Sequence, residues 1–307
     1  MDPRNSTPPD GARNLSGDDL TAAVLASFSH CDSDRLTQIM SSLVKHLHAF
    51  VVEAQLTEEE WASGIAFLTR VGHITTDQRQ EFILLSDVLG ASMQVIGINH
   101  QWPAGATEAT VFGPFFTANS PRYANGDDMA NGAPGEPCLM EGYVRSLDGA
   151  PIPNARIEVW QADDLGRYDV QYDDLDSARG RGHLFSDGDG RYSFWSLRPT
   201  AYPIPDDGPV GELLAATNRS PMRPAHVHFM ITAPSYHTLV THIFAKGDRY
   251  LDGDAVFGVK TTLIVPFERH EAGIAPDGGR IDRPFSTMRY DFTLAPIAPH
   301  EVEKPAG

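Results

Sequence analysis

The chain of 307 residues has little cysteine, little positive charge and no long apolar run. Its two cysteines, Cys31 and Cys138, are too few for a disulfide framework and predict reduced thiols in a cytoplasm. The net charge of −17 argues against nucleic acid and anionic membrane surfaces as partners. No apolar run approaches the roughly 20 residues that span a bilayer, and the polar residues 1–19 lack the apolar core of a signal peptide. We therefore expect a cytoplasmic protein without membrane insertion.

Composition and periodicity divide the chain into a helical part and a strand-rich part. Hydrophobic residues make up 41% and charged residues 21%, as in globular proteins. We expect a disordered tail over residues 1–18, a helical domain over 19–105 and a β-sandwich domain over 106–307, which is an α+β fold.

Helices are predicted from apolar residues that recur three and four positions apart. One such stripe follows Asp32 or Ser33, either of which can cap the helix start, and runs over Leu36, Ile39, Met40, Leu43, Leu47, Phe50 and Val51. A capping box at residues 57–60 opens a second helix. A third is expected to open at residues 75–78 and to continue to about residue 98.

Beyond Cys138 the apolar period changes to two, which predicts short strands in an antiparallel sandwich. The expected strands are 138–145, 155–161, 191–197, 225–233, 238–245, 258–267 and 287–294. Residues 199–221 include Pro199, Pro203, Pro205 and Pro209 and are expected to form a long irregular loop, which in a compact domain is usually functional.

Two histidines lie two residues apart in the expected strand 225–233. His226 and His228 therefore leave the same face of the strand, while Val227 leaves the other. A pair of this kind can bind one metal ion, although many such pairs are ordinary hydrogen-bonded residues. Apolar neighbours favour burial, and buried histidines need partners.

Two tyrosines upstream lie in unusual turn-rich settings and favour the metal interpretation. Tyr168 follows Gly166, and Tyr202 lies in the proline-rich loop. A phenol binds a metal as phenolate and must lose a proton whose pKa is about 10. Two phenols with two imidazoles suit a hard, highly charged ion such as ferric iron better than zinc. Ordinary buried tyrosines with bonded hydroxyls are the alternative.

Several ordered motifs around these residues resemble those of the intradiol ring-cleavage dioxygenases, the catechol 1,2-dioxygenase family. The motifs are Gly113-Pro114-Phe115, Trp160-Gln161-Ala162-Asp163 with Gly166 and Tyr168, DGDGRY at 187–192, YPIPDDGP at 202–209, and RPAHVH at 223–228. The helical segment also resembles that family's N-terminal linker domain. The resemblance therefore covers most of the chain.

The resemblance implies one ferric ion per subunit with four ligands: Tyr168, Tyr202, His226 and His228. It implies that the axial tyrosinate, here Tyr202, takes a proton from a bound diol. Arg223 would stabilise the developing anion, with a strand-end ion pair as the alternative. The pocket implied by the resemblance comprises Leu84, Asp87, Val111, Phe112, Gly113, Pro114, Ile204, Pro205, Arg223, His242 and Val256.

Two residues indicate which substrate within the family we expect. The catechol-cleaving branch usually has Gln where this chain has His242, and the surrounding residues resemble hydroxyquinol 1,2-dioxygenases instead. Their substrate carries a third hydroxyl, for which Asp87 is the candidate partner; the alternative is an aspartate on a helix surface. We therefore expect cleavage of hydroxyquinol to maleylacetate in aromatic compound catabolism.

Two other functions remain open on the sequence. One is a catechol or chlorocatechol 1,2-dioxygenase that forms cis,cis-muconates. The other is a non-catalytic β-sandwich binding module with a structural zinc ion. For the dioxygenase, the resemblance also implies a homodimer joined through the helical domain, with lipid held at that interface.

Overall fold

The computed structural model describes residues 13–77 and 79–298. The chain divides into two compact units, Met1–Thr69 and Arg70–Gly307. Residues 1–12, which are most of the expected disordered tail, lie outside the described residues. The expected domain boundary at residues 105 and 106 stays a prediction.

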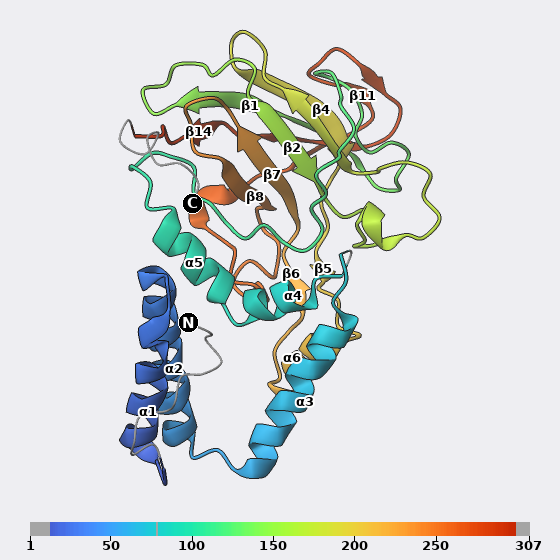
Figure 1. Ribbon diagram of the computed structural model, residues 1–307. Helices are drawn as coiled ribbons and strands as arrows, with labels where there is room; N and C mark the ends of the chain where they lie inside the picture. Colours follow the sequence, from blue (N-terminus) through green and yellow to red (C-terminus); the bar gives the residue numbers. More distant parts are fainter. Residues whose placement is uncertain (1–12, 78, 299–307) are drawn as a thin grey trace. The chain divides into compact units, whose positions relative to one another are not determined.

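The first unit is helical and confirms two predicted helix starts. It contains α1 (Gly17–Ala26), a 3-10 turn η2 (Ser27–His30), α2 (Asp34–Ala54) and most of α3 (Glu58–Ile74) (Figure 1). The Ser33 hydroxyl caps α2 by accepting a hydrogen bond from the backbone N–H of Leu36 at 3.2 Å. Thr57 and Glu60 bond each other's backbone N–H groups, at 3.2 and 2.9 Å, so the capping box opens α3 as expected.

The third predicted helix is wrong as a single element, because the chain bends by 77° at a glycine. The two pieces are α4 (Glu81–Val88) and α5 (Ala91–Asn99). Gly90 lies between them with φ of +74°, a left-handed conformation that L side chains rarely adopt. In the described part of the chain, no single helix is long and apolar enough to cross a membrane; α4 and α5 reach that length only together, as this bent pair.

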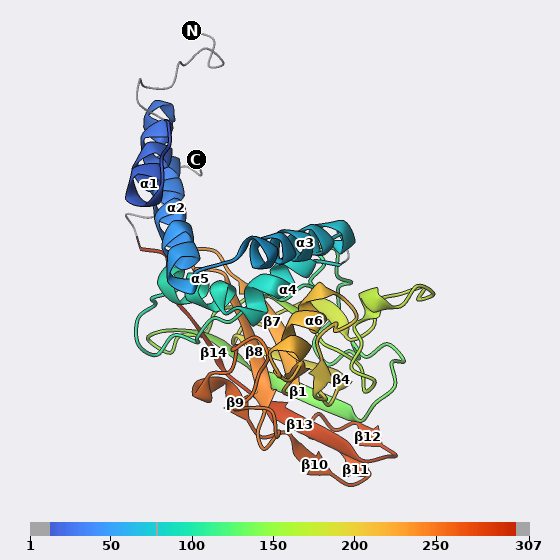
Figure 2. The same cartoon turned by 90° about the horizontal axis from the view of Figure 1, so that it is seen from below.

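Two five-stranded sheets pack face to face in the second unit and confirm the expected sandwich (Figures 1 and 2). One has the order β10 (Glu268–His270), β13 (Phe285–Arg289), β1 (Pro137–Ser146) and β14 (Phe292–Leu294), with β4 (Arg191–Leu197) also paired to β1. The other has the order β3 (Arg181–Phe185), β2 (Arg156–Trp160), β7 (His226–Thr232), β8 (Leu239–Ala245) and β9 (Ile264–Val265). The buried core includes the rings of Phe194, Phe229 and Phe292.

Several strand predictions need correction. The pairings β1–β13, β1–β14 and β8–β9 are parallel, although most others are antiparallel. The expected strand 258–267 is mainly loop with a 3-10 turn η4 (Thr261–Leu263) before β9. The expected strand 287–294 is two strands, interrupted where the Tyr290 carbonyl comes so close to Gly142 that any Cβ there would overlap it. β3 was missed because Gly180 and Gly182 flank a charged residue.

Short elements outside the sheets position the candidate site. The expected irregular loop 199–221 contains β5 (Tyr202–Pro203) and α6 (Pro209–Ala216) and is followed by β6 (Met222–Arg223). β5 and β6 form a two-stranded ribbon that pairs Tyr202 with Arg223. α6 begins with proline at its first position, where the missing N–H is not needed. Another 3-10 turn, η3 (Asp169–Gln171), follows Tyr168, and β11 (Gly273–Ile274) pairs with β12 (Arg280–Ile281).

Candidate active site

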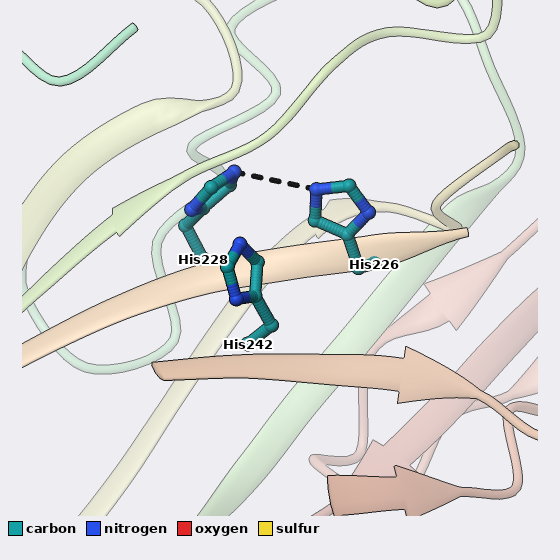
Figure 3. Close-up of side chains that lie close together, drawn as sticks. All are labelled: His226, His228 and His242. Carbon is teal, nitrogen blue, oxygen red and sulfur yellow. Dashed lines mark hydrogen bonds between the residues drawn. The ribbon is translucent and has the colours of Figure 1, made fainter. Parts of the chain in front are cut away.

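The central strand β7 carries both histidines of the predicted site. Val227 and Phe229 point into the sandwich core, so His226 and His228 share the opposite face, as predicted. On the neighbouring strand, His242 of β8 lies in register with His228. Figure 3 shows the three imidazoles gathered on this face, and all three are buried.

The two predicted tyrosines reach the same place from loops. Tyr168 precedes η3, where its backbone N–H donates to the side chain of Gln171 at 2.9 Å. Tyr202 comes from β5. Gly166 lets the two segments approach, because a Cβ at this position would lie 2.6 Å from Cβ of Tyr202. Both tyrosines are buried, at 0% and 4% exposure.

Four donor atoms from these side chains form a closed ring. The hydroxyls of Tyr168 and Tyr202 are 2.9 Å apart, and the Tyr202 hydroxyl lies 3.4 Å from Nε2 of His226. The two Nε2 atoms are 3.3 Å apart, and Nε2 of His228 lies 3.0 Å from the Tyr168 hydroxyl. Atoms that bind one ion at about 2.0–2.2 Å are themselves roughly 3 Å apart. The ring therefore has the size that a single metal ion requires.

Protonation states support the imidazoles as ligands. Nδ1 of His226 lies 2.6 Å from the Pro224 carbonyl oxygen and donates to it, which leaves Nε2 with its lone pair. Burial, together with the Arg223 charge, lowers the pKa of His226 to about 3. Burial and the neighbouring His226 lower the pKa of His228 well below its ordinary value. Both rings are therefore neutral at physiological pH, as metal binding requires.

The phenols are protonated until a cation is present. Burial, with the second phenol beside it, raises the pKa of Tyr168 well above 10. Burial also raises the pKa of Tyr202, although the Arg223 charge opposes that effect. A bound cation favours the phenolate, so loading of this site releases protons.

Buried nitrogen atoms without partners further distinguish this region. Among the described residues, Nδ1 of His228 and Nε2 of His242 are buried with no hydrogen-bond partner. Nδ1 of His242 bonds the Thr110 hydroxyl. His226, His228 and His242 could also hold an ion as a trio, since one nitrogen of each lies within 4.8 Å of the others. The tyrosine-containing set is tighter and suits a ferric ion better, whereas a structural zinc site prefers thiolates and imidazoles.

Aromatic rings hold two of the donors in place, although neither ring is predicted from the sequence to have a role. Trp160 stacks on His228 with centroids 4.7 Å apart and an interplanar angle of 18°. Phe115 stacks on Tyr168 at 4.5 Å and 22°. Both residues lie inside the motifs quoted above, so the motifs were the available signal. Their burial restricts the rotation of His228 and Tyr168.

Arg223 is buried beside the donor ring. Its Nη1 donates to Nε2 of His226 at 3.1 Å, and its Nε donates to the Asp254 carboxylate at 3.0 Å. The alternative of an ion pair is thus confirmed, but the pair is buried and faces the site rather than solvent. Asp254 was missed because no local pattern links it to Arg223.

A cavity of about 770 Å³ opens at the Tyr202 side of the site. Four predicted pocket residues line it: Leu84, Pro114, Ile204 and Pro205. Charged residues also line it, among them Arg79, Glu81, Arg167 and Asp207. Arg79 joins Asp207 through two hydrogen bonds of 2.8 and 3.0 Å and donates to buried Glu81 at 3.2 Å. This network ties α4 to the loop that carries Tyr202.

The remaining predicted pocket residues are not among those that line this cavity. Gly113 backs His228, because a Cβ on it would lie 3.0 Å from Cε1 of that ring. Phe112 packs against Trp160 at 5.8 Å between centroids but is 39% exposed. Val111 is buried beside Thr110 in sequence, and Val256 is buried two residues after Asp254.

Asp87 is a buried carboxyl group, not a helix-surface residue. It lies on α4 with 2% exposure. Burial raises the pKa of Asp87 to about 6, while a hydrogen bond from Ser92 and the Arg223 charge hold it below what burial alone would produce. The group therefore lies within electrostatic reach of Arg223.

Comparison with known proteins agrees with this geometry. The family model described as "Dioxygenase" matches residues 111–296, and that described as "Catechol dioxygenase N terminus" matches residues 33–107. A hydroxyquinol 1,2-dioxygenase from Nocardioides simplex is 58% identical, over 95% of this chain and 99% of the relative. A 6-chlorohydroxyquinol 1,2-dioxygenase from Cupriavidus pinatubonensis is 54% identical, over 90% and 96%. The crystal structure of a Pseudomonas putida hydroxyquinol 1,2-dioxygenase has a TM-score of 0.83 at 46% identity, over 91% of this chain and 98% of that one. The chain therefore belongs to the intradiol ring-cleavage dioxygenase family and is an enzyme.

Proposed function

We propose that this enzyme is a hydroxyquinol 1,2-dioxygenase. It cleaves benzene-1,2,4-triol with O2 between the two adjacent hydroxylated carbons, and the product is maleylacetate. The observation that carries the chemistry is the closed ring of two phenol and two imidazole donors, 2.9–3.4 Å apart. The choice of the triol is supported by the activities of relatives that are 54–58% identical.

Tyr168, Tyr202, His226 and His228 would hold one ferric ion per subunit. When bound, the ion supplies Lewis acidity and a template for two adjacent hydroxyl groups. The side chains supply the proton transfers. The Tyr202 phenolate oxygen would accept the proton from one of the two adjacent hydroxyl groups of the diol. Its placement beside Arg223 favours this role, because the guanidinium charge opposes the effect of burial on the pKa of Tyr202, and a bound metal ion would favour the phenolate further.

Arg223 is assigned a second electrostatic role in the same reaction. Its Nη1 faces the donor ring from a buried position, so it can stabilise negative charge that develops on the substrate. Burial lowers the pKa of Arg223, but the Asp254 carboxylate raises it by more. The pKa of Arg223 therefore lies above its ordinary value, and the guanidinium keeps its charge. A permanent cation at this point favours anionic substrate over neutral substrate.

Asp87 is proposed to select the third hydroxyl of the triol. With a pKa of about 6, the carboxyl group is mainly ionised above pH 7 and can accept a hydrogen bond. A buried acceptor left without a donor is costly, so an unsubstituted catechol would bind less well. His242 lies beside the ligand histidines, with centroids 4.1 Å from His228, and would shape the same pocket.

Oxygen uptake by the iron-loaded enzyme tests the assignment. Hydroxyquinol, catechol and chlorocatechol are compared, with an enzyme-free control because hydroxyquinol oxidises in air. We expect stoichiometric uptake with hydroxyquinol, little with catechol, and maleylacetate as product. A preference for catechol or chlorocatechol would leave the proposed mechanism in place but would assign a different substrate to the enzyme. No uptake with any diol would overturn the proposal.

Metal analysis separates the enzyme from a zinc-containing binding module. Phenolate-to-ferric charge transfer makes the proposed centre coloured, whereas a zinc protein is colourless. We expect one iron per subunit and a visible band that weakens in Tyr168→Phe, because one of the two phenolate ligands is then absent. A stoichiometric zinc content with no band would support the binding module instead.

We also propose a cytoplasmic homodimer joined through the helical domain, with lipid at its interface. In support, Cys31 and Cys138 are both unpaired, and α2 exposes a row of large apolar residues. The residues of that row are Leu36, Ile39, Leu43, Leu47 and Phe50.

A further inference from the structure

We propose that Asp254 is a positioning residue that orients Arg223 towards the reacting ring. This inference rests on the proposed function of the site. It assigns a role to a buried side chain that would act through Arg223.

The Asp254 carboxylate accepts hydrogen bonds from one edge of the Arg223 guanidinium. Nε of Arg223 donates to Oδ1 at 3.0 Å, and Nη2 lies 3.4 Å from Oδ2. Both side chains are almost fully buried, with side-chain exposures of 4% and 2%. Because Nε and Nη2 form one edge, binding them leaves Nη1 pointing away from the carboxylate.

The Nη1 group of Arg223 faces the donor ring. Nη1 lies 3.1 Å from Nε2 of His226, the nitrogen that also borders Tyr202 and His228 in the donor ring. A metal ion on that nitrogen would use its lone pair. Nη1–H would then need another acceptor, and the substrate is the anion that enters beside it.

The carboxylate is itself held by its own loop. Oδ1 accepts from the backbone N–H of Val256 at 3.3 Å, and Oδ2 accepts from that of Gly258 at 2.9 Å. The next residue, Ala255, donates its N–H to the carbonyl of Met222 in β6 at 3.1 Å. Asp254 is therefore fixed to the ribbon that carries Arg223, as a positioning group must be.

Charge explains why this position needs a carboxylate. Burial alone would raise the pKa of Asp254, but the Arg223 charge and hydrogen bond outweigh it and the pKa lies below its ordinary value. The ionised pair is neutral as a whole. Arg223 can thus remain buried and directed, whereas an unpaired buried guanidinium would turn towards solvent.

The main test compares Asp254→Asn with Asp252→Asn in the iron-loaded enzyme. Asp252 lies in the same loop and is exposed, so it controls for the loss of one negative charge. We expect Asp254→Asn to retain iron and the visible band but to lower kcat per bound iron by about 100-fold, the order seen when a catalytic group is misplaced by about 1 Å. KM should change little, because Arg223 acts mainly on developing charge.

A second pair of variants tests the same inference without changing the charge of the protein. In Gly258→Ala, the new Cβ would lie 3.3 Å from Oδ2 of Asp254 and 3.4 Å from Nη2 of Arg223. In Gly253→Ala, the new Cβ has nothing within 4 Å. We expect only Gly258→Ala to lower kcat. Equal kcat per iron for each variant and its matched control would overturn the inference.

Two further measurements distinguish positioning from a structural role and from failure of the proposed function. In an Arg223→Ala background, Asp254→Asn should have no additional effect on kcat, since its action passes through Arg223. A crystal structure of Asp254→Asn should show Nη1 displaced from Nε2 of His226; an undisplaced side chain would refute the inference even if the wild-type enzyme proved inactive on every diol. Inactive wild type with a displaced Arg223 would instead refute only the proposed function.

Discussion

The role proposed for Tyr202 combines metal ligation with proton transfer. Its hydroxyl contacts both the Tyr168 hydroxyl and Nε2 of His226, and its backbone pairs with Arg223. Removal of this hydroxyl leaves three donors in the ring. The Tyr168 contacts with Phe115 and His228 do not depend on it.

We predict that Tyr202→Phe retains iron but loses activity on hydroxyquinol by roughly 10²–10⁴-fold, the range for loss of a general base. Iron content, the visible band and kcat measure this. Tyr143→Phe on β1, remote from the ring, serves as the control and should keep full activity. Full turnover by Tyr202→Phe would contradict the proposed deprotonation.

Asp87 links substrate choice to pH-dependent stability. Folded Asp87 holds its proton up to a pKa of about 6, against 3.8 when unperturbed. The folded state thus binds more protons than the unfolded state between these values, and the contribution of Asp87 to stability falls as pH rises through this window. Two pKa units correspond to about 3 kcal/mol.

We predict that the free energy of unfolding of the iron-free wild type falls by about 2 kcal/mol relative to Asp87→Asn between pH 4 and pH 7. Urea unfolding across this range measures the difference. The same variant should lose at least about 10-fold in the ratio of kcat/KM for hydroxyquinol over catechol. A difference in stability that does not change with pH would show that Asp87 is not protonated in the folded protein near pH 5.

At the scale of elements, the site depends on two loops that approach closely at glycine. Gly166 has φ of +76°, and a Cβ on it would lie 2.6 Å from Cβ of Tyr202. Gly126 has φ of +91° but nothing within 4 Å of such a Cβ. The two positions share the backbone requirement and differ only in the contact.

We predict that Gly166→Ala loses iron and activity, because Tyr202 must move away from the donor ring. Gly126→Ala should keep both and lose only about 1–2 kcal/mol of stability through its left-handed backbone. Iron content, the visible band and the melting temperature separate these effects. Equal iron content in the two variants would show that the Gly166 contact does not position Tyr202.

At the scale of the whole molecule, the helical unit has an apolar surface that the proposed dimer would cover. Leu43 and Phe50 of α2 are 54% and 53% exposed. Val52 is 69% exposed but lies on the opposite side of the helix from Leu43. The two residues are nine positions apart, which is two and a half turns at 3.6 residues per turn. Exposed apolar rows of this kind mark interaction surfaces.

We predict a mass of twice the monomer for the wild type in light scattering. Leu43→Glu and Phe50→Glu should each shift the protein towards monomer, because a charge in an apolar interface is costly. Val52→Glu makes the same chemical change on the other side and should remain dimeric. A monomeric wild type, or equal behaviour of all three variants, would contradict the proposed interface.

The sequence by itself predicted the four donor residues that the structure brings together, and it predicted the longer helices and strands. Alternation around His226 and His228 predicted their shared face, and the capping residues Ser33 and Thr57 predicted two helix starts; the structure confirms both. These features are local, so they depend on backbone periodicity and on hydrogen bonds between near neighbours. The motif resemblance supplied the family.

Only the tertiary structure decided how distant residues combine. It bent the predicted third helix at Gly90, broke the last predicted strand at the Tyr290 carbonyl, and placed a helix in the proline-rich loop. It also paired Arg223 with Asp254, 31 residues apart, and buried Asp87. Such outcomes depend on close approach and on the burial of charge. They arise from packing between segments that are far apart in the chain, for which a sequence has no local signal.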